Sequence, residues 1–165
     1  ILTRITIANN FEIIEAIPKN ILFFTVIIGL ILLVGNIIVT EVWTIAAERR
    51  KHDETMKFAV LTLNWADVFF TAPGIFLALI SGLMLEELYH VGDEPWALAA
   101  FISFASAGVV WLLILVPLQA YFAQQSASKK LGAGFYRKLH LWYAAGIAAT
   151  LLTVLSLTLV IFNVA

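Results

Sequence analysis

The sequence contains a long apolar run between residues 21 and 47, which reads ILFFTVIIGLILLVGNIIVTEVWTIAA. Glu41 is the only ionisable residue in this run. About 20 consecutive apolar residues are enough for an α-helix to cross the roughly 30 Å hydrocarbon core of a bilayer. The run therefore predicts a membrane-spanning helix. Pro18, just before it, suits a helix start, because a proline there removes no helical hydrogen bond.

Three more runs of this kind follow, so the spans are expected at about residues 21–47, 56–85, 96–123 and 136–162. The runs are continuous, whereas the strands of a membrane β-barrel alternate in polarity and last only about 10 residues. We therefore predict an all-α fold, an integral membrane four-helix bundle of two antiparallel hairpins. Residues 19–165 would form this single domain.

The composition agrees with a membrane protein. Of the 165 residues, 62% are hydrophobic and 13% are charged, against about half and a quarter in average soluble domains. A small soluble domain could not bury so much apolar surface, which excludes a soluble enzyme and a disordered regulator. A net charge of −1 gives no field that would recruit nucleic acid. The absence of cysteine excludes disulfides, thiolate metal sites, iron–sulfur clusters and cysteine nucleophiles.

The charged residues separate by loop. Loops 48–57 and 124–138 contain eight of the ten basic residues, whereas loop 86–95 contains no lysine or arginine and four acidic residues. Because basic loops stay in the cytoplasm, we expect loops 48–57 and 124–138 to be cytoplasmic and both termini to lie outside. The expected location is a bacterial inner (plasma) membrane.

The first 18 residues differ from the spans. Asn9 and Glu12 have the spacing of a capping box, and Phe11, Ile14 and Ile17 recur at helical spacing. We expect residues 1–18 to form a short amphipathic helix in the outer interface.

Small and polar residues recur at steps of three or four in every span, which predicts close helix packing within one bundle. In the second span the stripe includes Gly74, Ala78 and Ser81. Pro73 and Pro117 should kink the second and third spans, because a proline lacks the backbone donor that a helix needs. Such kinks either shape a cavity or only reflect the tolerance of membrane helices for proline.

Polar residues at matching depth form the candidate site. At 1.5 Å per residue, Asn36 and Asp67 both lie roughly 16 Å from the cytoplasmic helix ends. An ionisable group in the membrane costs at least about 2.5–3.5 kcal/mol, so it usually has a partner. Asp67 is either a proton relay or ligand anchor, or a structural partner of Asn36, and Glu41 is shallow enough to reach the interface. The candidate intramembrane polar cluster comprises Asn36, Glu41, Asn64, Trp65, Asp67, Thr71, Trp111 and Gln119.

The three histidines do not predict a haem or metal site. A bis-histidine haem needs two inward imidazoles at one depth, but His52 and His90 fall in loops and His140 lies one turn into the fourth span. The sequence also contains no glycine-rich phosphate loop, HExxH motif or nucleophile elbow. We therefore expect no catalytic residues, no metal and no cofactor, with haem as the weaker alternative.

The stretch NWADVFFTAPG at residues 64–74, followed by SGLM at 81–84, resembles the signature of a bacterial family of predicted integral membrane proteins of unknown function. The resemblance covers about residues 20–163 and includes Asn36, Trp111 and Gln119. It implies four spanning helices and no assigned activity. Other small four-helix membrane families, with copper-resistance and haem-biosynthesis roles, carry a histidine early in their first helix. Here residues 19–23 read KNILF, without that histidine.

These observations favour a non-enzymatic multi-pass inner-membrane protein. It would be an accessory or interaction subunit, or would bind a small apolar ligand between kinked helices. Its expected partners are the lipid bilayer and either further copies of itself or a larger membrane complex, but not nucleic acid. One alternative is a small proton-coupled transporter that uses Asp67. Another is a membrane redox protein associated with haem or quinone.

Overall fold

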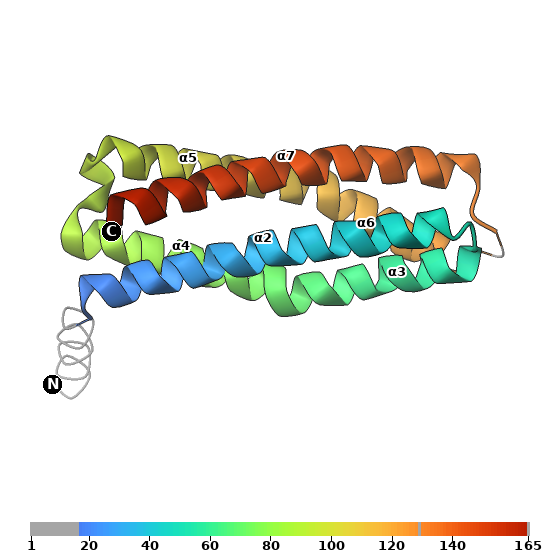
Figure 1. Cartoon of the computed structure of the whole chain (residues 1–165), viewed down its shortest axis with the longest axis horizontal. Coiled ribbons are helices and arrows are strands. Elements are labelled where there is room, and N and C mark those ends of the chain that lie inside the picture. The colour runs from blue at the N-terminus through green and yellow to red at the C-terminus, as the bar shows by residue number, and fades with distance from the viewer. Residues whose placement is uncertain (1–16, 129, 165) are drawn as a thin grey trace, which may run out of the picture.

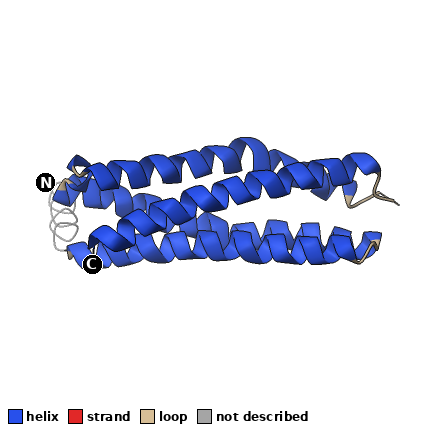
Figure 2. Cartoon of the chain, turned by 45° about the horizontal axis from the view of Figure 1, so that its top comes forward, coloured by secondary structure: helices blue, strands red, loops and turns tan. Residues whose placement is uncertain are grey.

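The computed structural model describes residues 17–128 and 130–164, and within these ranges all regular structure is helical (Figure 2). Four long helical spans lie side by side, as Figure 1 shows. The predicted all-α membrane bundle is thus confirmed, and each helix begins and ends a few residues beyond the expected span. The helix predicted for residues 1–18 lies outside the described residues, except for Ile17 and Pro18. The elements are α2 (Lys19–Arg49), α3 (Asp53–Ala66), η1 (Asp67–Thr71), α4 (Ala72–Tyr89), η2 (Val91–Asp93), α5 (Pro95–Val110), η3 (Trp111–Leu115), α6 (Val116–Gln125) and α7 (Ala133–Val164).

The bundle has two chemically different ends. We call the end with the connection between α4 and α5 the acidic-loop end, and the start of α2 and the end of α7 lie there too (Figure 1). The opposite end holds the connections between α2 and α3 and between α6 and α7, and we call it the basic-loop end. At the acidic-loop end, the Tyr89 hydroxyl donates a 2.7 Å hydrogen bond to the carbonyl of Ile17, so the start of α2 is fixed to the end of α4.

The helices bury two apolar cores, one toward each end. α2 packs against α4 and α7, α5 packs against α7, and α3 packs against α6. The core toward the acidic-loop end includes Leu30, Leu85 and Val160. The core toward the basic-loop end is more aromatic and includes Phe122, Phe135, Leu139 and Trp142.

The outer surface is also apolar, and it is largely aromatic and aliphatic on all four spans. A soluble protein rarely exposes such continuous apolar area, whereas lipid tails solvate it. All four helical spans are long and apolar enough to cross a bilayer. Exposed side chains include Phe24, Phe58, Phe69, Phe76, Leu113, Leu151 and Phe162.

The second and third spans each contain a π-helical turn. The N–H of Ala72 donates a hydrogen bond to the carbonyl of Asp67 in η1, and the N–H of Val116 donates one to the carbonyl of Trp111 in η3. A proline follows each turn, at the second residue of α4 and of α6 respectively. Because proline cannot donate the next backbone hydrogen bond, the chain adopts a widened turn just before it. The kinks predicted at Pro73 and Pro117 therefore take the form of π-turns.

Close backbone contact joins α2 to α4. A Cβ atom at Gly29 would lie 2.6 Å from the carbonyl oxygen of Gly74 and 2.7 Å from the nitrogen of Ala78. A Cβ atom at Gly74 would lie 2.8 Å from the carbonyl oxygen of Gly29. Real Cβ atoms do not approach backbone so closely, so both glycines are required for this crossing. Gly35, also on α2, has no neighbouring atom within 4 Å of such a Cβ.

We predict that Gly29→Ala destabilises the protein, whereas Gly35→Ala does not. The methyl group at position 29 would separate α2 from α4, and such overpacking costs about 1–3 kcal/mol. At position 35 the added methyl group meets open space. Alanine is also favoured over glycine in a helix by about 1 kcal/mol, so the change should not destabilise the protein. Thermal unfolding of the two variants in one detergent, followed by circular dichroism, measures the difference. Equal melting temperatures would contradict the close α2–α4 contact.

Candidate functional site

The carboxylate of Asp67 lies at the centre of a hydrogen-bond network that joins three elements. Asn36 on α2 donates through Nδ2 to Asp67 Oδ1 at 2.7 Å and to Thr71 Oγ1 at 2.8 Å. Thr71 in turn donates its hydroxyl to Asp67 Oδ1 at 2.7 Å. Gln119 on α6 donates through Nε2 to the other oxygen, Oδ2, at 2.7 Å. Asn36, Thr71 and Gln119 are all buried.

Local sequence explains this geometry. Asp67 and Thr71 are the first and last residues of η1, four positions apart, so their side chains share one face. Asn36 faces them across the α2 contact, and Gln119 follows Pro117 in the first turn of α6. Both carboxylate oxygens are therefore engaged by donors, which offsets the cost of placing a charge away from water. The arrangement holds three helical elements in register.

The other four candidates lie outside this network. Trp65 is exposed on the outer surface, where its ring stacks on that of Phe69 at 6.1 Å. Asn64 is half-buried one turn before Asp67 and takes no part in the bonds above. Trp111 is half-buried, and its indole Nε1 is buried with no hydrogen-bond partner among the described residues. Glu41 lies against α7, whereas Asn36 contacts η1.

Glu41 belongs to a second polar group, between α2 and α7. Its Oε1 is buried and has no hydrogen-bond partner in the described part of the chain. It lies directly against Gly146, where any Cβ atom would collide with it. The hydroxyl of Tyr143, one turn along α7, is likewise buried and unpartnered there, and Glu48 and Glu41 are its acidic neighbours. Toward the basic-loop end, His140 Nε2 lies 2.9 Å from Glu48 Oε1.

This second group was not predicted as a unit. The sequence placed His140 one turn into its helix, but it did not indicate which face of α7 meets α2. The signal that could have found it is the spacing: His140, Tyr143 and Gly146 recur every three residues, and Glu41 and Glu48 are two helical turns apart. No three histidine, aspartate or glutamate residues among those described are placed to hold a metal ion.

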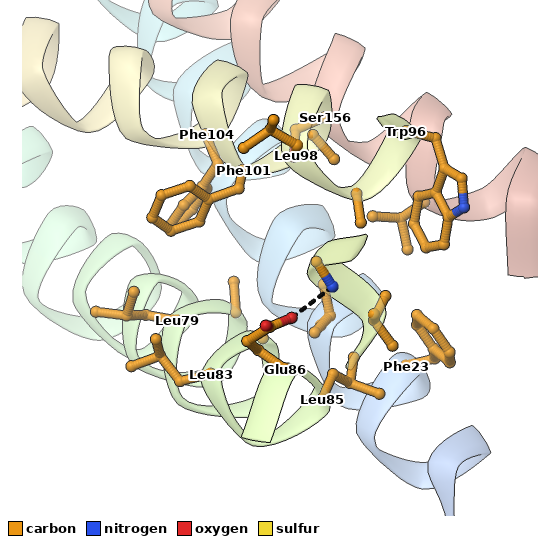
Figure 3. A pocket seen from close by; sticks show the side chains of 18 of the residues that line it. Phe23, Leu79, Leu83, Leu85, Glu86, Trp96, Leu98, Phe101, Phe104 and Ser156 are labelled. Carbon is orange, nitrogen blue, oxygen red and sulfur yellow. Dashed lines mark hydrogen bonds between the residues drawn. The ribbon is translucent and has the colours of Figure 1, made fainter. Parts of the chain in front are cut away.

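An apolar cavity of about 410 Å³ lies toward the acidic-loop end, between α2, α4, α5 and α7 (Figure 3). Phe101 and Phe104 on α5 line one side and Leu79 and Leu83 on α4 the other, with Trp96 close to the loop (Figure 3). Glu86 also lines it, and its carboxylate accepts a hydrogen bond from the backbone N–H of Gly92. A second apolar hollow is bounded only by α2 and the adjoining second span.

We predict that Asp67 and Gln119 are energetically coupled. Gln119→Glu would place two carboxylates together and should destabilise the protein by about 1–3 kcal/mol. Adding Asp67→Asn should restore stability, because the amide at position 67 can donate to the carboxylate at 119 and still accept from Asn36 and Thr71. Asp67→Asn alone should cost little, since the Gln119 amide can rotate.

A double-mutant cycle of thermal unfolding in detergent measures this coupling. Matched variants at Gln124, a polar residue on the same helix, serve as the control because it is not bonded to Asp67. If the effects of Asp67→Asn and Gln119→Glu simply add, the network does not stabilise the bundle in the way described.

Comparison with known proteins identifies the family. Residues 20–163 match the family described as predicted integral membrane protein (DUF2269). No curated protein and no solved structure matches the chain. The matched range covers all four helical spans, the Asp67 network and the cavity. The chain therefore belongs to the DUF2269 family of predicted integral membrane proteins.

Proposed function

We propose that this protein is a non-enzymatic, multi-pass protein of a bacterial inner membrane that holds a small apolar molecule in the cavity at its acidic-loop end. The observation that carries the proposal is the cavity itself. Its volume of about 410 Å³ falls within the roughly 300–1,000 Å³ of small-molecule sites, which are mostly apolar with few polar groups. Four different helices contribute to its walls.

The walls indicate the chemistry of the ligand. Aromatic rings from α2 and α5 and leucines from α4 line the cavity, and the Glu86 carboxylate is already engaged by Gly92 N–H. Among the described residues, no lysine or arginine lines it. An apolar molecule or a hydrocarbon chain suits such walls, because it loses no hydrogen bonds on leaving lipid or water.

The cavity opens sideways between α4 and α5. Leu79 and Leu83 on α4, and Leu98 and Phe101 on α5, line it and are at the same time exposed. α4 and α5 are joined by η2 but do not pack extensively against each other. In the orientation that we propose, with the basic loops in the cytoplasm and both termini outside, this opening faces the outer leaflet. The ligand would enter from the lipid.

We further propose that the protein acts with further copies of itself or within a larger membrane complex, since apolar side chains cover the outer surface of all four spans.

The two alternative functions, proton-coupled transport and haem binding, have less support. Proton-coupled transport through Asp67 requires a carboxylate free to change partners, whereas both its oxygens accept hydrogen bonds. Haem ligation requires two facing histidines, whereas His52 precedes α3, His90 follows α4 and His140 pairs with Glu48.

The proposal predicts that Gly82→Leu strongly reduces ligand retention. Gly82 lines the cavity, and a Cβ atom there meets nothing within 4 Å, so a larger side chain has room to begin at this position and a leucine should occupy part of the cavity. Native mass spectrometry of detergent-purified protein should detect a bound apolar molecule, whose occupancy falls on the order of ten-fold or more in the variant.

Gly108→Leu is the matched control. A Cβ atom at Gly108 would also meet nothing within 4 Å, but this residue does not line the cavity. The variant should retain the ligand as the unchanged protein does. Equal occupancy in the protein and in Gly82→Leu, or equal loss in both glycine variants, would overturn the proposed site.

A further inference from the structure

We infer that Glu41 is a proton-exchanging site inside the membrane-spanning region, reached from the basic-loop end through Tyr143, Glu48 and His140. The proposal concerns the seam between α2 and α7, which lies away from the apolar cavity. It adds a reversible proton-binding function that ligand binding does not require.

The first observation is the state of the Glu41 carboxyl group. Its Oε1 is buried with no hydrogen-bond partner among the described residues, in contrast to both oxygens of Asp67. A carboxylate oxygen buried without a donor bears an uncompensated cost of charge burial, which a proton on the carboxyl group would remove. Glu41 is therefore the acid in this bundle that is suited to gain and lose a proton.

The second observation is the space made for this carboxyl group. Glu41 Oε1 occupies the position that a side chain at residue 146 would fill. Gly146 is buried on α7 and provides that space. An acid that merely extended to the interface would need no such accommodation. The carboxyl group instead packs into the α2–α7 contact.

The third observation is a series of titratable groups leading from Glu41 to the end of the bundle. Tyr143 follows along α7, with its hydroxyl buried, unpartnered in the described chain, and neighboured by both Glu41 and Glu48. Glu48 then lies 2.9 Å from His140, whose side chain is 64% exposed. Glu41 and Glu48 are seven residues apart, about 10.5 Å along the helix axis. A hydroxyl between them can pass protons by accepting one and donating another.

The other ionisable groups around α2 are committed elsewhere. Asp67 of η1 is bonded to Asn36, Thr71 and Gln119. Lys57 of α3 is paired with Glu54 at 2.7 Å. α4 contributes no ionisable side chain between Ala72 and Leu85. The groups that face Glu41 and can exchange protons with it are thus Tyr143 and Glu48, with His140 beyond them.

The first test asks whether Glu41 takes up a proton. The full chain in liposomes is treated with dicyclohexylcarbodiimide, a hydrophobic reagent that attacks protonated carboxyl groups, and the labelled residue is located by peptide mass spectrometry. We expect label on Glu41 that increases as the pH falls, and little on Asp67, which is the internal control in the same unaltered protein. Absence of label on Glu41 at every pH, or label that does not change with pH, overturns the proposal.

The second test asks whether the proton travels along the seam. Infrared spectroscopy follows the carbonyl band of protonated Glu41, assigned by its loss in Glu41→Gln, and the rate at which transfer to heavy water shifts that band. Tyr143→Phe keeps the ring and removes the hydroxyl, so the exchange should slow by roughly ten-fold or more. Tyr136→Phe is the matched control on the same helix, because that hydroxyl faces Asp53. Equal rates in the two tyrosine variants overturn the path and with it the proposal.

Discussion

The structure depends on one constraint, which is that the half-buried Asp67 carboxylate must be hydrogen-bonded within the membrane-spanning part of the bundle. Asn36, Thr71 and Gln119 supply the donors. The Asn36–Asp67 contact also sets the register of the antiparallel pair α2 and α4. Seven residues before Asn36 is Gly29, and seven residues after Asp67 is Gly74, and these two glycines are the ones in backbone contact. A polar contact and a close packing contact therefore specify the same alignment, two helical turns apart.

The two π-turns explain how one bundle has a packed half and an open half. Between the turns and the basic-loop end, α3 and α6 pack against each other, and Gln119 of α6 reaches Asp67. On the other side of the turns, α4 and α5 no longer pack extensively, and the cavity lies between them. Pro73 and Pro117 are the chemical cause, because each lacks the donor that a regular helix would use. The two prolines that interrupt the second and third spans thus also separate α4 from α5, the two helices between which the cavity lies.

The sequence alone was sufficient for the fold and for part of the site. Continuous apolar runs predict four spans, because the thickness of a bilayer sets their length. Depth along the helices placed Asn36 beside Asp67, and the structure shows that contact. Depth says nothing about the direction in which a side chain points around the helix axis. For that reason the sequence did not predict that Trp65, at a similar depth, lies on the outer surface. It also did not predict that Glu41 lies against Gly146 of α7. The kinks at Pro73 and Pro117 made a cavity one of two interpretations of the sequence, but its position could not be predicted, because it depends on where α4 and α5 separate.

α2 and α7 connect the two regions to which the proposals assign functions. Neither helix contains a proline or a π-turn within its described length. Phe23 of α2 and Val160 of α7 line the cavity, while Glu41 and Tyr143, on the same two helices, form the polar seam toward the other end. A proton gained at Glu41 would change the charge in the α2–α7 contact but leave the Asp67 network intact. Any effect on the cavity would then have to travel along this uninterrupted pair, whereas α4 and α5, from the two interrupted spans, are the helices between which the proposed ligand would enter.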